Sequence, residues 1–191
     1  HVMAKHKNIC NHVHLPVQSG SNRILKEMNR QHSVEEYLTL VNRMWEIIPE
    51  ASISQDMIIG FPSETEEDHQ DTLALMEQVK FAFGYMYKYS ERPGTARKFE
   101  DDIPEATKKR RLSEVVDQQR KNGAYRTQQF VGKVTEILVE KESKKNPDQW
   151  SGRNEQSIVA VFPKGDYKPG DFVQVKINSC TSATLIGEAV S

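Results

Sequence analysis

The spacing of hydrophobic and polar residues changes several times along the chain, and each change predicts an element of secondary structure. Apolar residues at every second position of HVHLPVQ predict a short strand over 12–18. The segment 51–60 ends in a continuous apolar run closed by a glycine, which is typical of a strand buried on both faces in a parallel sheet. The aromatic-rich segment 81–89 predicts a third strand.

Helices are predicted between these strands because capping residues precede apolar residues at helical spacing. Ser21 is a candidate N-cap of a short helix, and Ser33 with Glu36 forms the capping-box pattern of an amphipathic helix. This second helix ends before Pro49, and Thr65 is the candidate cap of another helix with an acidic first turn. Strands and helices therefore alternate as in βαβ units, which predicts an α/β fold with a parallel sheet. Three strands are too few to close a barrel.

The last part of the chain has a different pattern. A long helix is predicted over 104–126, with Pro104 at its first position, and short strands then alternate with turn residues from Phe130 onward. About five short strands in about 60 residues predict a small antiparallel barrel of the oligonucleotide-binding kind. The chain therefore divides into an α/β part, 1–126, and a small β-barrel, 127–191.

Composition narrows the classes of function. Lys and Arg total 26 and Asp and Glu total 27, so the chain as a whole has no basic field to attract nucleic acid, and any RNA contact must come from a local patch. Cys10 and Cys180 form neither a disulfide framework nor a zinc-type pair. The sequence has no long apolar run and no signal-peptide pattern, so we expect no membrane association and a reduced, cytoplasmic setting. His1 in place of Met suggests a piece of a longer protein.

Polar loops follow all three predicted strands. The carboxyl ends of parallel strands meet at one rim, where open α/β sheets bind ligands, and this rim would consist of the loops 18–21, 60–64 and 89–95. The same loops can equally serve as helix caps and tight turns. Asp56 lies within an apolar strand, where a carboxylate needs a partner or a ligand, whereas His14 is expected to be a core histidine. The sequence shows no Ser/His/Asp arrangement and no metal-ligand cluster, so no catalytic residue is assigned.

Four stretches of the sequence resemble one enzyme family. They are HLPVQSGSNRILKEMNR, IIGFPSETEEDHQDTL, YKYSERPGTARKFEDDIPEATKKRRL and the tail from VGKVTEILVE to SATLIGEAV. Over nearly the whole chain they are similar to the carboxy-terminal half of the radical-SAM methylthiotransferases, most of all to the bacterial members that act on N6-isopentenyladenosine in tRNA. The resemblance implies transfer of a methylthio group to C2 of that adenosine, next to the anticodon, started by the deoxyadenosyl radical that S-adenosylmethionine yields.

The resemblance also implies a fold and cofactors. Residues 1–126 would be the carboxy-terminal half of an incomplete (βα)6 radical-SAM barrel, and residues 127–191 a TRAM domain, which is a small OB-like antiparallel β-barrel. Members of the family carry two [4Fe-4S] clusters besides S-adenosylmethionine. The CxxxCxxC triplet that holds the radical-generating cluster is absent from this sequence, and Cys10 and Cys180 lack the spacing to replace it. No metal ligand is therefore assigned, and we expect the chain alone to be inactive.

Residues that match the family's motifs are expected to bind the cofactor or RNA. Gln18 and Ser19 would line the cofactor rim. Ile59 and Gly60 would lie against the adenine, and Asp56 would order the end of that strand. Basic side chains would contact the cofactor carboxylate or the phosphates of a tRNA anticodon stem-loop: Arg92 at the rim, and Lys133, Lys144, Lys145 and Arg153 in the barrel.

Other functions stay open at this stage. A methylthiotransferase could act on threonylcarbamoyladenosine in tRNA or on a ribosomal protein, and a non-catalytic RNA-binding module could use the α/β layer as a scaffold.

Missing barrel strands would also leave one edge of the sheet without neighbours, and exposed edges pair with other chains. We therefore expect self-association through the exposed barrel edge, at Val13, Val17, Ile58, Ile59 and Phe83.

Overall fold

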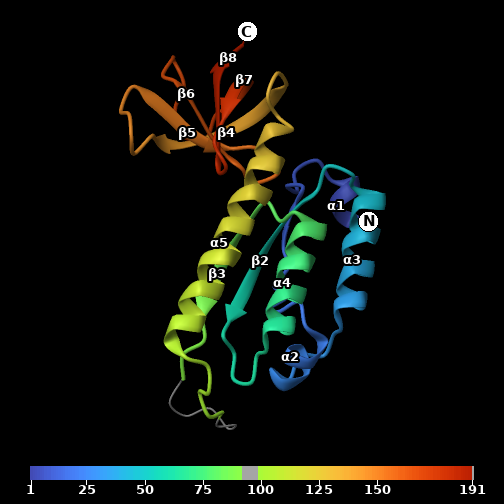
Figure 1. Cartoon of the computed structure of the whole chain (residues 1–191). Helices are drawn as coiled ribbons and strands as arrows, with labels where there is room; N and C mark the ends of the chain where they lie inside the picture. The colour runs from blue at the N-terminus through green and yellow to red at the C-terminus, as the bar shows by residue number, and fades with distance from the viewer. Residues whose placement is uncertain (92–98, 191) are drawn as a thin grey trace.

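A computed structural model describes residues 1–91 and 99–190, and its first part is a parallel sheet with helices packed against it (Figure 1). The strands lie in the order β1-β2-β3, where β1 is His12–His14, β2 is Ser52–Ile59 and β3 is Phe83–Lys88. The helices are α1 (Val2–Lys5), α2 (Asn22–Glu27), α3 (Val34–Ile47), α4 (Glu66–Val79) and α5 (Glu105–Gln128). Both strand pairs are parallel, so the predicted α/β fold is confirmed.

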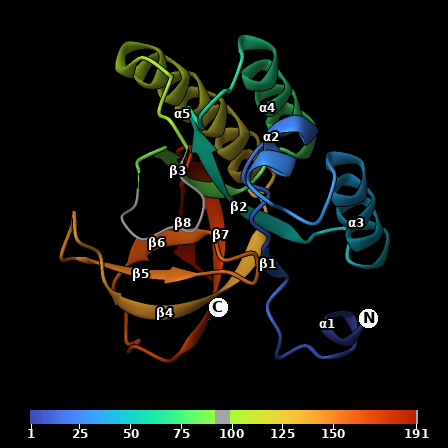
Figure 2. The ribbon, with the colours of Figure 1, turned by 90° about the horizontal axis from the view of Figure 1, so that it is seen from below.

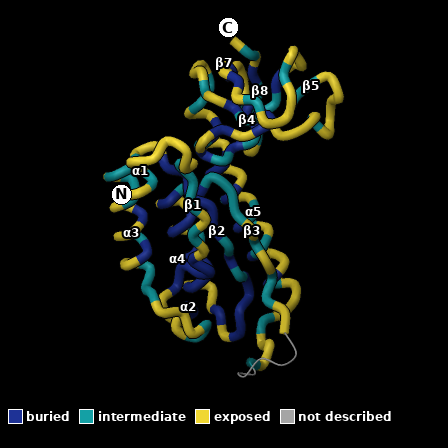
Figure 3. The backbone as a smooth tube through the Cα atoms, turned by 180° about the vertical axis from the view of Figure 1, so that it is seen from behind, coloured by how far each residue is buried: buried dark blue, intermediate teal, exposed yellow. Residues whose placement is uncertain are grey.

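Helices α3, α4 and α5 cover one face of the sheet (Figure 2). Seen from behind, the described residues place no helix over the other face (Figure 3). Ile53, Met57 and Ile59 of β2 point towards the helices and are at most 1 % exposed. Because side chains alternate along a strand, the residues between them face the uncovered side, which we call the open face.

The predicted caps form. Ser33 and Glu36 make a capping box at the start of α3, and Thr65 and Asp68 make one at the start of α4. The hydroxyl of Ser21 accepts a hydrogen bond from the main chain at the start of α2. These local bonds satisfy N–H groups that the first turn of a helix leaves free.

The first strand is shorter than predicted. β1 ends at His14, and the Leu15 N–H makes one more bond to β2, to the Ser54 carbonyl at 2.8 Å. The chain pairs with β2 again at Gln18, which forms an isolated parallel bridge with Met57. Pro16 lies between these points and has no N–H to donate to a ladder. His14 is exposed, so the expectation of a core histidine was wrong; this residue lies on the open face, which no helix of the described residues covers.

The expected loss of neighbours at the sheet edge applies to only part of the named set. Val17 and Ile59 are completely buried because both pack in the core beneath the helices. Val13, Ile58 and Phe83 are half-buried.

The second part of the chain is a closed barrel in the order β4-β5-β6-β8-β7. Its strands are β4 (Val134–Glu142), β5 (Gln149–Arg153), β6 (Val159–Pro163), β7 (Phe172–Cys180) and β8 (Thr184–Ala189). All pairs are antiparallel except β6 with β8, which is parallel. The predicted small antiparallel barrel is confirmed, with one parallel pair where it closes. The chain reverses direction twice between β6 and β8, once on entering β7 and once on leaving it, so β6 and β8 run in the same direction.

Helix α5 joins the two parts as one continuous element (Figure 1). The Thr127 hydroxyl donates to the carbonyl of Thr181 at 2.7 Å, and the Ser52 hydroxyl donates to the carbonyl of Gln156 at 2.6 Å. The barrel is thus held both at the end of α5 and at the amino end of β2. Across the described residues, none of the helices has the length and apolar character needed to cross a membrane.

Candidate ligand-binding site

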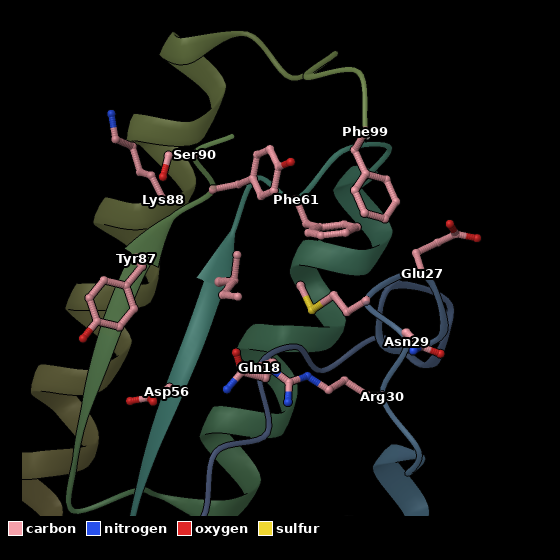
Figure 4. Close-up of a pocket in the computed structure, with 13 residues that line it drawn as sticks. Gln18, Glu27, Asn29, Arg30, Asp56, Phe61, Tyr87, Lys88, Ser90 and Phe99 are labelled. Atoms are coloured by element: carbon pink, nitrogen blue, oxygen red, sulfur yellow. The ribbon is translucent and has the colours of Figure 1, made fainter. Parts of the chain in front are cut away.

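A cavity of about 580 Å³ opens at the carboxyl ends of β2 and β3 (Figure 4). This volume falls within the range of about 300–1,000 Å³ that is usual for small-molecule sites. Charged and amide side chains and one hydroxyl line it, from the loop after β1, the end of α2 and the residues after it, β2, and the end of β3: Gln18, Glu27, Asn29, Arg30, Asp56, Lys88 and Ser90. The cavity therefore lies at the rim where the parallel sheet predicts a ligand.

Gln18 has an unusual backbone conformation beneath this cavity. Its φ is 75°, in the left-handed region that residues other than glycine seldom adopt. Its N–H donates to the carbonyl of Asp56 at 3.0 Å, and its own carbonyl accepts from the N–H of Ile58 at 2.9 Å. Two bonds to β2 thus hold a conformation that costs on the order of 1–3 kcal/mol, a form of strain that clusters at ligand sites.

Asp56 carries an unsatisfied oxygen. Its Oδ1 is buried and has no hydrogen-bond partner, while Oδ2 lies 3.5 Å from Nε2 of His14. In Figure 4 the Asp56 carboxylate and the Gln18 amide lie on the same side of the cavity. An unpaired buried carboxylate oxygen is costly, so this group favours a ligand that brings a positive charge or a hydrogen-bond donor.

Aromatic rings form the opposite wall. Phe61 is 5 % exposed, and its ring meets those of Tyr89 and Phe99 edge-on, at centroid distances of 5.3 Å and 4.8 Å. Tyr87 of β3, whose ring is 55 % exposed, lies on the same side of the cavity as Asp56 in Figure 4. A planar apolar group can pack against such a wall, so the cavity combines an aromatic side with a polar one.

A buried ion-pair cluster holds the loops behind the cavity. Asp68 accepts hydrogen bonds from the Ser21 hydroxyl at 2.6 Å, from the Thr65 hydroxyl at 2.7 Å and from the guanidinium of Arg23. Burial by itself would raise the pKa of Asp68, but these donors together hold that pKa well below its ordinary value. The cluster therefore ties the start of α2 to the start of α4.

The glycine at the end of β2 has its own local partners. The Gly60 N–H donates to Oε2 of Glu64 at 2.9 Å, and the same oxygen pairs with Arg111 at 2.9 Å. Burial raises the pKa of Glu64, against the opposing effects of the Gly60 N–H and the Arg111 guanidinium. This amide is therefore already occupied within the protein.

The residues expected to bind the cofactor fall into two groups. Gln18 and Asp56 line the cavity. Ser19 is 1 % exposed, and its hydroxyl accepts from the main chain of the helix cap at 3.2 Å. The Ile59 side chain lies in the helix-covered core, and Gly60 packs against Lys108. Arg92 lies outside the described residues.

Sequence reasoning missed several lining residues. Ile58, rather than Ile59, faces the cavity, and Tyr87 stands beside it in the register of β2 and β3. Strand alternation could have grouped Asp56, Ile58 and Tyr87, but only once the register was known. Arg30 is the last residue of the first stretch that resembles the family, but no role was assigned to it there because it lies 12 residues after Gln18 and beyond α2.

The basic residues expected to contact RNA are exposed but spread over the barrel. Lys144 and Lys145 lie in the loop before β5, and Arg153 ends that strand, so roughly 16 Å of extended chain separates them. Arg153 lies 3.5 Å from Glu140, which offsets part of its charge. Lys133 precedes β4, near the junction with α5.

Potential metal ligands of the described residues are engaged with one another or lie far apart in the fold. Glu66, His69 and Glu114 have ligand atoms within 4.8 Å of each other. Arg110 pairs with both carboxylates, at 2.6 Å and 2.8 Å, and His69 bonds Glu114 at 2.6 Å, so an ion-pair network accounts for the group. The two cysteines are in different parts: Cys10 precedes β1, and Cys180 ends β7.

Comparison with known proteins agrees with both parts of the fold. Residues 1–76 match the Radical SAM superfamily, and residues 128–190 match the TRAM domain. A tRNA-2-methylthio-N(6)-dimethylallyladenosine synthase of Flavobacterium johnsoniae is 67 % identical over 192 residues, which cover 100 % of this chain and 40 % of the relative. The chain is related to these synthases over its whole length. The resemblance expected from the sequence motifs is thereby confirmed.

More distant synthases show the same relation. The synthase of Bacteroides thetaiotaomicron is 49 % identical over 99 % of this chain, and that of Chlorobium chlorochromatii 48 % identical over 97 %. Each match covers 42 % of the relative, so the chain spans about two fifths of the length of these synthases. Among solved structures, coproporphyrinogen III oxidase from Escherichia coli, described as a radical SAM enzyme, superposes with a TM-score of 0.52 at 16 % identity, covering 76 % of this chain and 41 % of the oxidase. At this identity the likeness concerns the fold alone.

Proposed function

We propose that this chain is part of a tRNA methylthiotransferase that adds a methylthio group to C2 of N6-isopentenyladenosine next to the anticodon. The observation that carries the proposal is the match to synthases along the whole chain, combined with a rim cavity that contains the unpartnered Asp56 carboxylate oxygen. A substrate in tRNA would place the protein in the cytoplasm.

The cavity suits S-adenosylmethionine. The Asp56 carboxylate would accept hydrogen bonds from the ammonium group of the cofactor, and the Arg30 guanidinium would pair with the cofactor's carboxylate. Gln18 would add a hydrogen bond, and Phe61 and Tyr87 would pack against the adenine. When bound and reductively cleaved, the cofactor supplies the deoxyadenosyl radical, whereas the side chains of this chain bind and orient it.

The remaining expected residues would support the rim from behind. Ser19, Ile59 and Gly60 fix the ends of the loop after β1 and of β2 through buried contacts, without side chains in the cavity. Arg92 keeps its proposed role towards a carboxylate or phosphate. The two [4Fe-4S] clusters would be held by cysteines outside these residues, because the sequence has only Cys10 and Cys180 and they lie in different parts of the fold.

Binding of S-adenosylmethionine tests the cavity directly. We expect the chain to bind the labelled cofactor in equilibrium dialysis, and Asp56→Asn to weaken binding by roughly tenfold, since one charge-assisted hydrogen bond is lost. Asp166→Asn, in an exposed turn of the barrel, is the matched control and should bind as the parent does. Equal binding by both variants would assign the cofactor to another place.

The barrel would bind the anticodon stem-loop, with Lys133, Lys144, Lys145 and Arg153 on phosphates. A titration with an isopentenylated stem-loop and an unmodified hairpin, at two salt concentrations, tests this. Salt-dependent binding that prefers the isopentenylated RNA supports the proposal. Changing Lys144 and Lys145 to Ala should make the slope of log K against log salt concentration shallower, by the amount that about two phosphate contacts contribute. Equal weak binding of both RNAs would favour a generic phosphate contact, and no binding would favour a protein substrate.

A further inference from the structure

A continuous line of hydrogen bonds crosses the open face of the sheet. The carbonyl of Gln156, in the barrel, accepts from the Ser52 hydroxyl at 2.6 Å, and that oxygen lies 2.7 Å from Nδ1 of His12. Nε2 of His12 lies 3.0 Å from the Ser54 hydroxyl, which lies 2.9 Å from Nδ1 of His14. The line therefore alternates serine and histidine from the barrel towards the cavity.

Strand register explains why these side chains meet. His12 stands opposite Ser52 in the parallel pair of β1 and β2, and His14 stands opposite Ser54. Residues two positions apart lie on one face of a strand, so all four side chains share the open face with Asp56. The same histidine–serine pairing therefore occurs twice along the two strands, and the two pairs together form the line.

The carbonyl at one end sets the direction of every bond. A carbonyl can only accept, so the Ser52 hydroxyl gives its single proton to Gln156 and must accept from Nδ1–H of His12. A neutral His12 then has a bare Nε2, which accepts from the Ser54 hydroxyl. The Ser54 oxygen in turn accepts from Nδ1–H of His14. Burial, followed by His14 and Arg153, lowers the pKa of His12, in keeping with a neutral ring at this place.

The last group of the line reaches the cavity. With its Nδ1 proton given to Ser54, His14 turns Nε2 towards Oδ2 of Asp56, at 3.5 Å. When the ring carries a second proton, on Nε2, this contact is an ion pair that engages Oδ2, while Oδ1 has no partner within the protein. When the ring is neutral, Nε2 is bare and cannot donate to Asp56. The ring edge of Tyr85, 6.5 Å from the His14 ring, and the ring of Phe83, stacked on His12 at 5.0 Å, limit how these imidazoles can rotate.

We propose that Gln156, Ser52, His12, Ser54 and His14 form a one-way hydrogen-bond line by which the barrel fixes the orientation of Asp56, and that His14 is a positioning residue for this carboxylate. The line itself rests on geometry alone, and only its effect on cofactor binding rests on the proposed function. The charged or titratable groups around the two imidazoles are each other, Asp56, Arg153 and Tyr85.

Nitrogen NMR of the histidine rings in the 191-residue chain tests the line without any ligand. At a pH where both rings are neutral, we expect His12 and His14 to carry the proton on Nδ1, the opposite of the form that a free imidazole side chain prefers. Nε2–H signals from both rings in the parent chain would overturn the proposal, whatever any variant does.

Two variants then test the order of the line. Ser54→Ala should move the ring-nitrogen signals of both histidines and return His14 to the Nε2–H form, while Ser52→Ala should act first on His12. Ser151→Ala, at a buried strand serine of the barrel, is the control and should leave both rings unchanged. Unchanged rings in Ser54→Ala, with amide spectra that show a folded chain, would also overturn the proposal.

Cofactor binding gives the second readout. Ser54 does not line the cavity, yet Ser54→Ala should weaken binding of S-adenosylmethionine by about tenfold, equivalent to roughly one hydrogen bond, at a pH where the His14 ring carries both protons. If the parent chain shows the Nδ1–H rings but does not bind the cofactor, the proposed function fails while the line stands. If the parent chain binds and Ser54→Ala binds equally well, the positioning role of His14 is wrong.

Discussion

Gly60 and Lys108 are in such close contact behind the cavity that a Cβ on Gly60 would lie 2.5 Å from Cγ of Lys108. Gly60 also has a φ of 71°, in the region that favours glycine. Lys108 cannot easily yield, because it is 3 % exposed and its ammonium group pairs with Asp101. Gly60 therefore meets two independent requirements, one of backbone conformation and one of space.

We expect Gly60→Ala to destabilise the chain by about 2–4 kcal/mol, as the sum of about 1–2 kcal/mol for the left-handed conformation and about 1–2 kcal/mol for overpacking. Gly132→Ala separates the two effects, since Gly132 has a φ of 85° but nothing within 4 Å of an added Cβ. Urea unfolding of both variants measures the difference. Equal losses of stability would show that Lys108 moves aside without cost.

The sequence predicted elements and caps well because these depend on neighbours along the chain. Ser33 with Glu36 formed the expected capping box, and Asp56 stood out because a carboxylate in an apolar strand is conspicuous. The choice between Ile58 and Ile59 could not be made in the same way. In a continuous apolar run both faces of the strand carry apolar side chains, so the sequence does not show which face is covered. Only the packing of the helices decides which side chain enters the core.

Long-range features were hidden for a related reason. The left-handed conformation of Gln18 is imposed by two hydrogen bonds to β2, about 40 residues away in sequence, and no local signal marks it. The parallel pairing of β6 with β8 likewise follows from barrel closure rather than from either strand's own sequence.

Asp68 should make stability depend on pH. Its folded-state pKa lies below the ordinary value, so it contributes stability that is present above about pH 4, the unfolded-state pKa, and is lost as the pH falls through the lower folded-state pKa. We expect Asp68→Asn to cost about 1.5–3 kcal/mol at pH 7, the usual range for hydrogen bonds to a charged group.

The difference in unfolding free energy between the parent chain and Asp68→Asn should shrink as the pH is lowered from 5 towards 2. Asp71→Asn, an exposed position on the same helix, controls for the change in net charge. A difference that stays constant over this pH range would show that the carboxylate of Asp68 is not the source of the stability.

The open face should lead to self-association of the isolated chain. Tyr85 and Tyr87 are each 55 % exposed on this face, and β1 and β3 each pair only with β2 among the described strands. Light scattering at rising concentration should show species larger than 21.9 kDa, and Tyr85→Lys with Tyr87→Lys should reduce them. A monodisperse 21.9 kDa species at high concentration would contradict the expectation.

The junction of α5 with the barrel depends on Gly123. A Cβ at this position would lie 2.3 Å from the carbonyl oxygen of Ser182, which belongs to the backbone of the turn between β7 and β8. Alanine would favour the helix by about 1 kcal/mol, but overpacking against a backbone atom costs about 1–3 kcal/mol, so we expect Gly123→Ala to lose up to about 2 kcal/mol.

The loss should be local to the junction. Because Thr127, one turn further along α5, bonds the carbonyl of Thr181, displacement of the turn should also weaken that bond and speed amide exchange around 181–184. Ser113→Ala, exposed on the same helix, gains helix propensity with no contact to the barrel and should be neutral or slightly stabilising. If Gly123→Ala instead stabilised the chain as Ser113→Ala does, the turn would have to accommodate the methyl group, and the barrel would be held less rigidly on α5 than these contacts require.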